Sequence, residues 1–248
     1  MKKYELTDET VRVGSRTLYR VRALCDIPGR GVQKGDTGGF VEAERNLSQF
    51  GEAWVSGDAQ VSGVAQVFGD AQVSGNARVF SDAQVFGDAR VSGDARVSGN
   101  AQVFGDARVS DDARVSGAAR VSDNAQVSGD AQVSGNAQVF GNAQVFGDAQ
   151  VFGDAQVSDN ARVSGDEILH VTGLPSGVVT MFPTTDGWTL TIGCWSGTVD
   201  ELETMIQGDD WPESRGEEQA LRRPGLEALV ALCRAHVGLV EARKEQEK

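Results

Sequence analysis

The chain has 248 residues, of which 24% are charged and 40% are hydrophobic, as expected of a folded protein with one to three domains. Its net charge of −13 argues against direct binding along a nucleic-acid backbone, which needs clustered lysine and arginine, but permits a basic protein partner. The three cysteines, Cys25, Cys194 and Cys233, are far apart and lack CxxC spacing. We therefore expect neither a disulfide framework nor a zinc site, and a reducing compartment is favoured.

The first 50 residues form a slightly basic segment with nine basic and seven acidic residues. No apolar core follows its two lysines and no later apolar run is long enough for a membrane span, so neither a signal peptide nor a membrane anchor is expected. Residues Thr10–Leu24 are predicted to form a hairpin around Gly14-Ser15. The glycine-rich run Gly29–Gly35 is not followed by a helix pattern, so it predicts a turn-rich cap instead of a phosphate-binding loop.

From Gly51 to Ser164 the chain repeats the hexad G-[DN]-A-[QR]-V-[SF] nineteen times without an insertion. The third position is always Ala and the fifth always Val, and this alternation places both on one side of a short strand. Gly with Asp or Asn predicts a turn after each strand. Short strands joined by turns, without helices, predict a β-solenoid with a thin Ala/Val core that is stabilised by stacking of neighbouring coils.

This repeat resembles that of hexapeptide-repeat β-helices, and the resemblance implies a triangular, left-handed solenoid with three hexads, or about 18 residues, in each coil. Three sets of residues in the block agree with this period, because the members of each set recur at the same position of every third hexad. These sets are Phe68, Phe86 and Phe104, continued by Phe140 after Ser122; Arg78, Arg96 and Arg114; and Asn124, Asn142 and Asn160.

Residues 165–248 lack the hexad and predict a small α+β domain. Strands are expected at Glu167–Val171, Val178–Phe182 and Trp188–Trp195, separated by turns at residues 173–177 and 185–187. The pair Thr198 and Glu201 forms a capping box that opens a helix. Pro224 is expected early in a second helix. The apolar stripe of that helix consists of Leu226, Leu229, Val230, Cys233, Val237 and Val240.

Both flanks also resemble segments of hexapeptide-repeat proteins that are common in phages and prophages and mostly of undetermined function. The N-terminal resemblance rests on Lys34–Glu42, Asn46–Gln49 and Gly51–Val55. The C-terminal one rests on Gly193–Leu202, which reads GCWSGTVDEL. This resemblance implies a bacterial host, and with the cysteine pattern and no expected signal peptide or membrane span, a cytoplasmic location is expected. The predicted organisation is a β-rich cap over residues 1–50, the solenoid over 51–164 and the α+β domain over 165–248.

Many hexapeptide β-helices are acyltransferases, and those enzymes use a histidine base on the coils and an inserted loop. The nineteen hexads contain neither, and the two histidines of the chain, His170 and His236, lie outside them. Calcium binding is not expected either, because the spacing of the acids differs from that of calcium-binding solenoids. We therefore predict no catalytic residue, no cofactor and no metal site.

Position six of the hexad alternates away from Ala and Val, so Phe68, Phe86 and Phe104 are expected to form an outward apolar strip, with Phe140 further along. Such strips mark interfaces, and the alternative is that a flank of the same chain covers the strip. The arginines Arg78, Arg96 and Arg114 are expected either to be neutralised by neighbouring Asp residues or to contact an anion or a partner.

The sequence thus predicts a non-enzymatic solenoid that binds or organises a protein partner and forms a dimer or higher oligomer. Three alternatives stay open: an acidic inhibitor of a host nucleic-acid-binding or defence protein, a filament of solenoids stacked end to end, and a relic of a hexapeptide acyltransferase. For the first alternative, the repeat block carries fourteen acids and seven arginines, a net charge of −7 over ~30 Å, whereas B-DNA of that length carries roughly 18 negative charges. The charge density of the solenoid is therefore well under half that of DNA.

Overall fold

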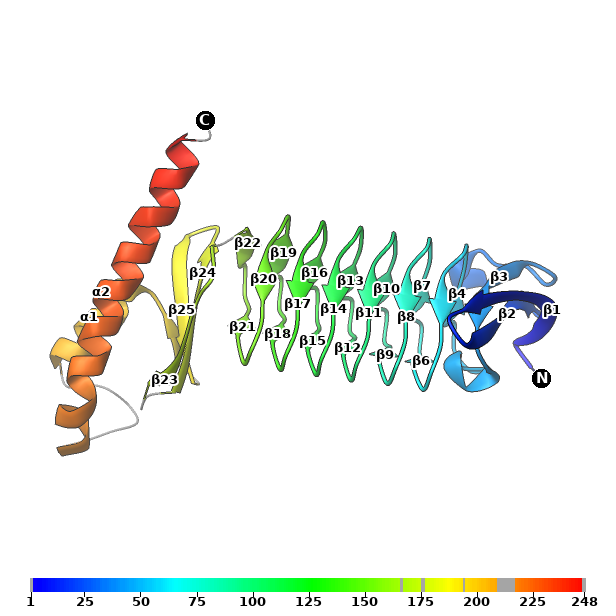
Figure 1. Ribbon diagram of the computed structural model, residues 1–248, viewed down its shortest axis with the longest axis horizontal. Coiled ribbons are helices and arrows are strands. Elements are labelled where there is room, and N and C mark those ends of the chain that lie inside the picture. The colour runs from blue at the N-terminus through cyan, green and yellow to red at the C-terminus, as the bar shows by residue number, and fades with distance from the viewer. Residues whose placement is uncertain (1, 166, 175–176, 194, 209–216, 247–248) are drawn as a thin grey trace.

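The computed structural model describes residues 2–165, 167–174, 177–193, 195–208 and 217–246. The molecule is elongated, with the solenoid in the middle, a β-hairpin cap at one end and a sheet with two helices at the other (Figure 1). The predicted turn residues 175–176 and Cys194 lie outside the described residues.

The N-terminal cap contains the predicted hairpin, which is longer than the pattern indicated. Strand β1 (Tyr4–Val13) pairs antiparallel with β2 (Arg16–Ala23), and Val13 faces Arg16 across the turn at Gly14-Ser15. Two 3-10 turns, Pro28–Arg30 and Glu44–Asn46, lie before and after β3 (Thr37–Val41).

Strand β3 connects the cap to the solenoid, because it pairs antiparallel with β2 and parallel with β5 of the first full coil. Near this junction Lys3 is buried and its ammonium group donates hydrogen bonds to the carbonyl oxygens of Ala53 (2.8 Å) and Gly51 (3.2 Å). Burial lowers the pKa of Lys3 to about 8. Lys3 therefore satisfies backbone acceptors of the first coil that no preceding strand pairs with.

The solenoid consists of three parallel sheets, one on each side of a triangular coil. One sheet contains β4 (Trp54–Val55), β7 (Gln72–Val73), β10 (Arg90–Val91), β13 (Arg108–Val109), β16 (Gln126–Val127), β19 (Gln144–Phe146) and β22 (Arg162–Ser164). The second continues from β3 through β5 (Gln60–Val61), β8 (Arg78–Val79), β11 (Arg96–Val97), β14 (Arg114–Val115), β17 (Gln132–Val133) and β20 (Gln150–Val151). The third contains β6 (Gln66–Val67), β9 (Gln84–Val85), β12 (Gln102–Val103), β15 (Arg120–Val121), β18 (Gln138–Val139) and β21 (Gln156–Val157).

The strand register confirms the predicted period of three hexads in each coil. Arg96 pairs with Arg78 on one side and with Arg114 on the other, and Val103 pairs with Val85 and Val121. Every hexad Ala and Val is buried, in a single continuous core. The alternation of small inward and polar outward residues therefore determines which side of each strand faces the core.

The corners between strands explain the glycine at position one. These glycines have a positive φ, for example +68° at Gly99, which glycine adopts without a steric cost. The four hexads without glycine keep the same conformation, with φ between +56° and +64° at Ser81, Asp111, Asp123 and Asp159. The Asp111 carboxylate accepts a hydrogen bond from the N–H of Gly129 in the next coil (3.1 Å), which offsets part of the strain.

The C-terminal domain contains a four-stranded antiparallel sheet, β23 (Leu169–Leu174), β24 (Gly177–Thr184), β25 (Gly187–Ile192) and β26 (Trp195–Gly197). The prediction of one strand over Trp188–Trp195 is wrong, because the chain reverses after Ile192 and Trp195 pairs back with it. Gly193, with φ of +57°, permits this reversal.

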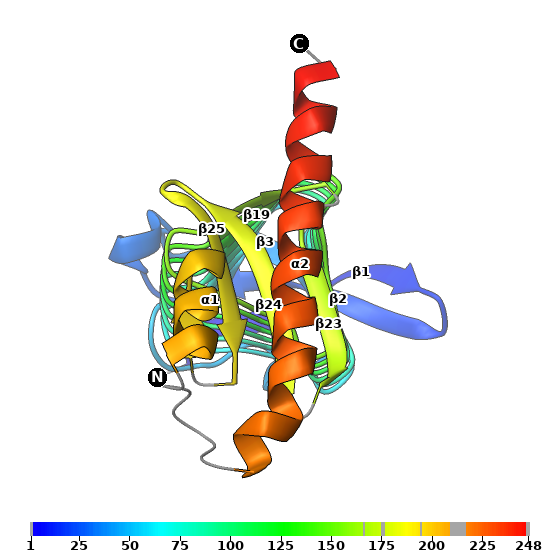
Figure 2. The same ribbon diagram turned by 90° about the vertical axis from the view of Figure 1, so that its left-hand side faces the viewer.

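Two helices cover the outer side of this sheet (Figure 2). Helix α1 (Val199–Gly208) begins with the predicted capping box, since the Glu201 N–H donates to Thr198 Oγ1 (3.2 Å) and the Thr198 N–H to Glu201 Oε2 (2.8 Å). Helix α2 spans Glu217–Gln246. Pro224 was expected near its start, but the helix begins earlier and the proline lies inside it. Contacts of the following turns with α1 and the sheet stabilise the helix despite the lost hydrogen bond.

Segments of the chain cover both ends of the solenoid. At the far end, Phe182 of β24 is fully buried and packs into the Ala/Val core, and Gln156 of the last coil donates its N–H to Thr180 Oγ1 (3.3 Å). At the near end, Tyr4, Val21 and Leu47 join the same core. Neither end of the solenoid is left open for stacking of a second solenoid (Figure 1).

Candidate functional site

The predicted phenylalanine column lies on the third sheet of the solenoid. The rings of Phe68 and Phe86 are stacked with centroids 4.9 Å apart and planes 4° apart, and those of Phe86 and Phe104 with 5.0 Å and 3°. The prediction that Phe68 lies directly below Phe86, and Phe86 below Phe104, is confirmed. The spacing of the rings matches the spacing of the strands that carry them, so the stack is a direct result of the three-hexad coil.

These rings are half-buried, whereas the alternation pattern predicted an outward strip in contact with water. Each ring lies against the ring of the next coil, and this stacking removes part of its surface from solvent. Phe140 continues the column two coils beyond Phe104 and is also half-buried, while Ser122 interrupts it. The flanking segments pack on the ends of the solenoid (Figure 1). The rings stay partly exposed.

The surface around the column is poor in charge. We define the Phe face as the outward side chains of the third sheet: Gln66, Phe68, Gln84, Phe86, Gln102, Phe104, Arg120, Ser122, Gln138, Phe140, Gln156 and Ser158. Arg120 is its only charged member, whereas the outward positions of each of the other two sheets carry three arginines. A weak hydrogen bond of 3.5 Å joins the amides of Gln102 and Gln84. The Phe face is therefore the least charged side of the solenoid.

The corner that leads into the Phe face is also low in charge. Its position-two residues are Val64, Asp82, Asn100, Ala118, Asn136 and Asp154. The corner that leads into the second sheet carries five acids at the same positions: Asp58, Asp94, Asp112, Asp130 and Asp148, with Asn76 as the only neutral member. The acidic charge of the solenoid is therefore distributed unequally between its edges.

The three predicted arginines are brought together on the second sheet, where Arg96 lies between Arg78 and Arg114 in adjacent strands. All three are exposed. The neutralisation expected from neighbouring Asp residues is not formed as ion pairs, because within the described part of the chain no carboxylate oxygen lies within 4.0 Å of these guanidinium groups. Sequence reasoning overlooked a second pair, Arg90 and Arg108, which occupy the same position in successive coils and are adjacent on the first sheet.

The two histidines lie near the junction of the solenoid and the C-terminal domain. His170 Nδ1 is 3.4 Å from Thr180 Oγ1, its Nε2 is buried without a hydrogen-bond partner, and burial lowers its pKa. His236 Nε2 is 3.1 Å from the Glu167 carbonyl oxygen, and its ring lies edge-on to Trp188. Both contacts are those of structural side chains. Across residues 2–165, 167–174, 177–193, 195–208 and 217–246, no three His, Cys, Asp or Glu side chains cluster in a way that could hold a metal ion.

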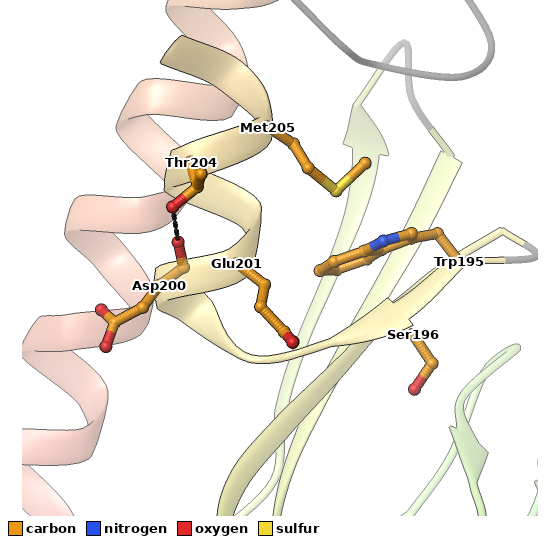
Figure 3. A pocket seen from close by; sticks show the side chains of 6 residues that line it. All are labelled: Trp195, Ser196, Asp200, Glu201, Thr204 and Met205. Atoms are coloured by element: carbon orange, nitrogen blue, oxygen red, sulfur yellow. Dashed lines mark hydrogen bonds between the residues drawn. The ribbon is translucent and has the colours of Figure 1, made fainter. Parts of the chain in front are cut away.

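The C-terminal domain has a cleft of about 440 Å³ between α1 and β26, lined by Trp195, Ser196, Asp200, Glu201, Thr204 and Met205 (Figure 3). Three of its polar side chains are engaged within the domain. Glu201 serves the capping box, Thr204 Oγ1 donates to the Asp200 carbonyl oxygen (2.8 Å), and the Asp200 carboxylate pairs with Arg234 (2.9 Å). The cleft therefore offers no converging set of free polar groups for a ligand.

The fold defines the chain as a repeat protein of the β-solenoid class. Eight segments match the family model described as the YdcK beta solenoid repeat: residues 71–87, 83–99, 89–105, 101–117, 107–123, 119–135, 131–147 and 155–170. The solenoid is thus similar to that repeat in sequence. A comparison with curated proteins gave no match. Among the described helices, none combines the length and the apolar character needed to span a membrane.

Proposed function

We propose that this chain is a non-enzymatic scaffold, of the phage or prophage type and acting in the bacterial cytoplasm, that binds a protein partner through the Phe face. The observation that supports this most strongly is the stack of Phe68, Phe86 and Phe104 on the least charged side of the solenoid. Aromatic enrichment and depletion of charge are the features that distinguish the centre of a protein interface from the remaining surface.

The dimensions of the face agree with a reversible complex. Six strands ~4.8 Å apart and six residues of ~3.3 Å along each side give an area of roughly 570 Å². A partner that covered it would bury about 1,100 Å² in total, close to the lower limit of specific interfaces. Because the rings are half-buried already, covering each one contributes only roughly 1 kcal/mol to the binding free energy. Three rings together therefore lower the Kd by about two orders of magnitude.

A role without catalysis is consistent with the positions of the histidines. His236 contacts the C-terminal domain, and His170, although its ring packs edge-on against Phe152 of the last coil, belongs to β23 and not to a hexad. Neither histidine is therefore carried by a coil, where acyltransferases of this repeat type have their base. The covered solenoid ends also argue against a filament built by end-to-end stacking. The proposal therefore rests on lateral binding.

A second candidate function, inhibition of a basic host protein, is favoured by the acidic corner with Asp94, Asp112, Asp130 and Asp148 in successive coils. Its spacing of ~4.8 Å between charges is wider than that of duplex DNA. Binding at this corner should weaken steeply with salt, whereas binding at the Phe face should respond little to it. A salt titration of the complex therefore separates the two functions.

The test is the triple variant Phe68→Ser, Phe86→Ser and Phe104→Ser, since Ser is the other residue that the hexad accepts at position six. The matched control is Phe80→Ser with Phe152→Ser, which makes the same exchange at position six of the second sheet. A partner captured from bacterial lysate is purified and titrated against the native chain and both variants. We expect about a hundredfold weaker binding for the triple variant and native affinity for the control. Equal affinity of the triple variant and the native chain would overturn the proposal.

A further inference from the structure

Helix α2 has an apolar surface on both sides. The inner side, with Leu226, Leu229, Val230 and Cys233, packs on the sheet and α1. The outer side presents seven exposed residues without a charge among them: Ala228, Ala231, Leu232, Ala235, Gly238, Leu239 and Ala242. Figure 2 looks onto this side of the domain, where α2 is the outermost layer and no described segment covers it. A surface helix of a monomeric protein normally carries charged and polar residues there.

The outer side contains more than small residues that favour helix formation. Leu232 and Leu239 are 45% and 53% exposed, and they are one heptad apart, so they lie on one line along the helix. The two leucines alternate along the helix with three alanines, so that successive members are four, three, four and three residues apart: Ala228, Leu232, Ala235, Leu239 and Ala242. Such spacing is the pattern of a coiled-coil seam, with leucine at one core position and alanine at the other.

No charged side chain of α2 lies among these seam residues, and several of the charged residues beside it or on the inner side pair within the same chain. Arg234 forms ion pairs with Asp200 (2.9 Å) and Glu203 (2.6 Å), Arg223 pairs with Glu227 (3.4 Å), and Lys244 pairs with the buried Glu167. The seam itself is therefore neutral, so no like charges meet across it, and only the longer-range repulsion between two chains of net charge −13 opposes the contact.

We propose that the outer side of α2 binds the same helix of a second copy of this chain, in an antiparallel pair. In an antiparallel pair each leucine position faces an alanine position of the other helix, so Leu232 lies against Ala235 of the second copy and Leu239 against Ala228. Every such layer then combines one large and one small side chain, which fills the space evenly. A parallel pair would alternate leucine–leucine with alanine–alanine layers, which pack less uniformly.

The contact fits a reversible dimer. In this register residues 221–246 of the two helices overlap over ~39 Å, and a helix diameter of ~10 Å gives roughly 390 Å² for each copy. About 780 Å² in total is below the standard size of specific interfaces, so a weak, concentration-dependent dimer with a Kd of micromolar or above is expected. Because α2 is the outermost layer of the C-terminal end, the pair leaves the Phe face of both copies accessible (Figure 1). The dimer would then present two partner-binding faces.

The test compares the molecular mass of the full chain and its variants by sedimentation at micromolar concentrations. The variant Leu232→Glu with Leu239→Glu places like charges in the seam, and the mass should fall by half while the helical circular dichroism is kept. The control, Phe80→Glu with Phe152→Glu, makes the same change in charge at two exposed residues of the solenoid and should stay dimeric. A native chain that is monomeric at these concentrations, or a seam variant that stays dimeric, would overturn the proposal.

A single substitution tests the antiparallel direction. Ala235→Leu creates leucine–leucine layers against Leu232 in the antiparallel pair, so dimerisation should weaken. In a parallel pair it would fill an alanine–alanine layer and strengthen dimerisation, which would contradict the proposed direction. Binding at the Phe face is measured separately with the triple serine variant. Loss of dimerisation with partner affinity retained therefore identifies the seam alone, and the converse result identifies the Phe face alone.

Discussion

Phe182 offers the sharpest test of how the solenoid is closed. It belongs to the C-terminal domain, yet its fully buried ring packs into the Ala/Val core under the last coil. Removing a fully buried phenylalanine ring costs about 3–5 kcal/mol, because the transfer energy is lost and a cavity is left. The small side chains around it, alanines and valines with little rotamer freedom, cannot collapse into the space. We therefore expect Phe182→Ala to fall in the upper half of that range.

The loss should be local, since each coil of a solenoid contacts only its neighbours. Hydrogen exchange of the amides in β20, β21 and β22 should accelerate first in Phe182→Ala, while β5 and β8 keep native protection. Urea unfolding gives the size of the effect. Phe152→Ala, which removes the same ring from a site that is 53% exposed, should cost less than about 1 kcal/mol. A loss below about 1 kcal/mol for Phe182→Ala, or acceleration spread evenly over all coils, would refute the idea that this ring closes the core.

Two further predictions concern the corners and the junction. Gly99→Ala should lower the free energy of unfolding in urea by more than Gly14→Ala. Both glycines have a positive φ, which costs an L-residue about 1–2 kcal/mol, but only at Gly99 would the new Cβ also meet backbone atoms of Gly117, at 2.7 and 2.9 Å. Equal losses of stability in the two variants would show that the spacing of the coils does not select glycine. Burial lowers the pKa of His170, so the unfolded chain takes up a proton that the folded chain resists, and stability should fall as the pH drops below about 6.5. His170→Gln should show a smaller loss between about pH 7.5 and about pH 5.5, and an unchanged slope would exclude His170 as the titrating group.

The hexad pattern determined the solenoid almost completely. Because Ala and Val alternate with polar residues, only one side of each strand can face the core. Because three hexads close one coil, the phenylalanines of every third hexad, Phe68, Phe86 and Phe104, stack on one another. The hairpin at Gly14-Ser15 and the capping box at Thr198 were also readable, because each depends on residues only a few positions apart. Local and periodic signals require no knowledge of distant contacts.

The limits of the periodic signal show at the edges of the repeat. Phe50 stands one coil period before Phe68 and would extend the column, but it is 84% exposed. Leu47 pairs with Val67 there, although an unbroken period would place Gln49 opposite Val67, and Ser48 donates its N–H to the Val67 carbonyl oxygen (2.9 Å). The cap residues therefore enter the first coil out of phase with the hexads, and only the pairing of the strands reveals it.

Other features were decided by the tertiary structure alone. The charge-poor character of the Phe face depends on which corners and outward residues three successive hexads bring to the same side, and not on the composition of any one hexad. The closing role of Phe182, and the outer position of Leu232 and Leu239, depend on where a sheet and a helix outside the repeat dock. Amphipathic patterns identify which residues prefer burial, but the partner that buries them is chosen by packing between segments far apart in the chain.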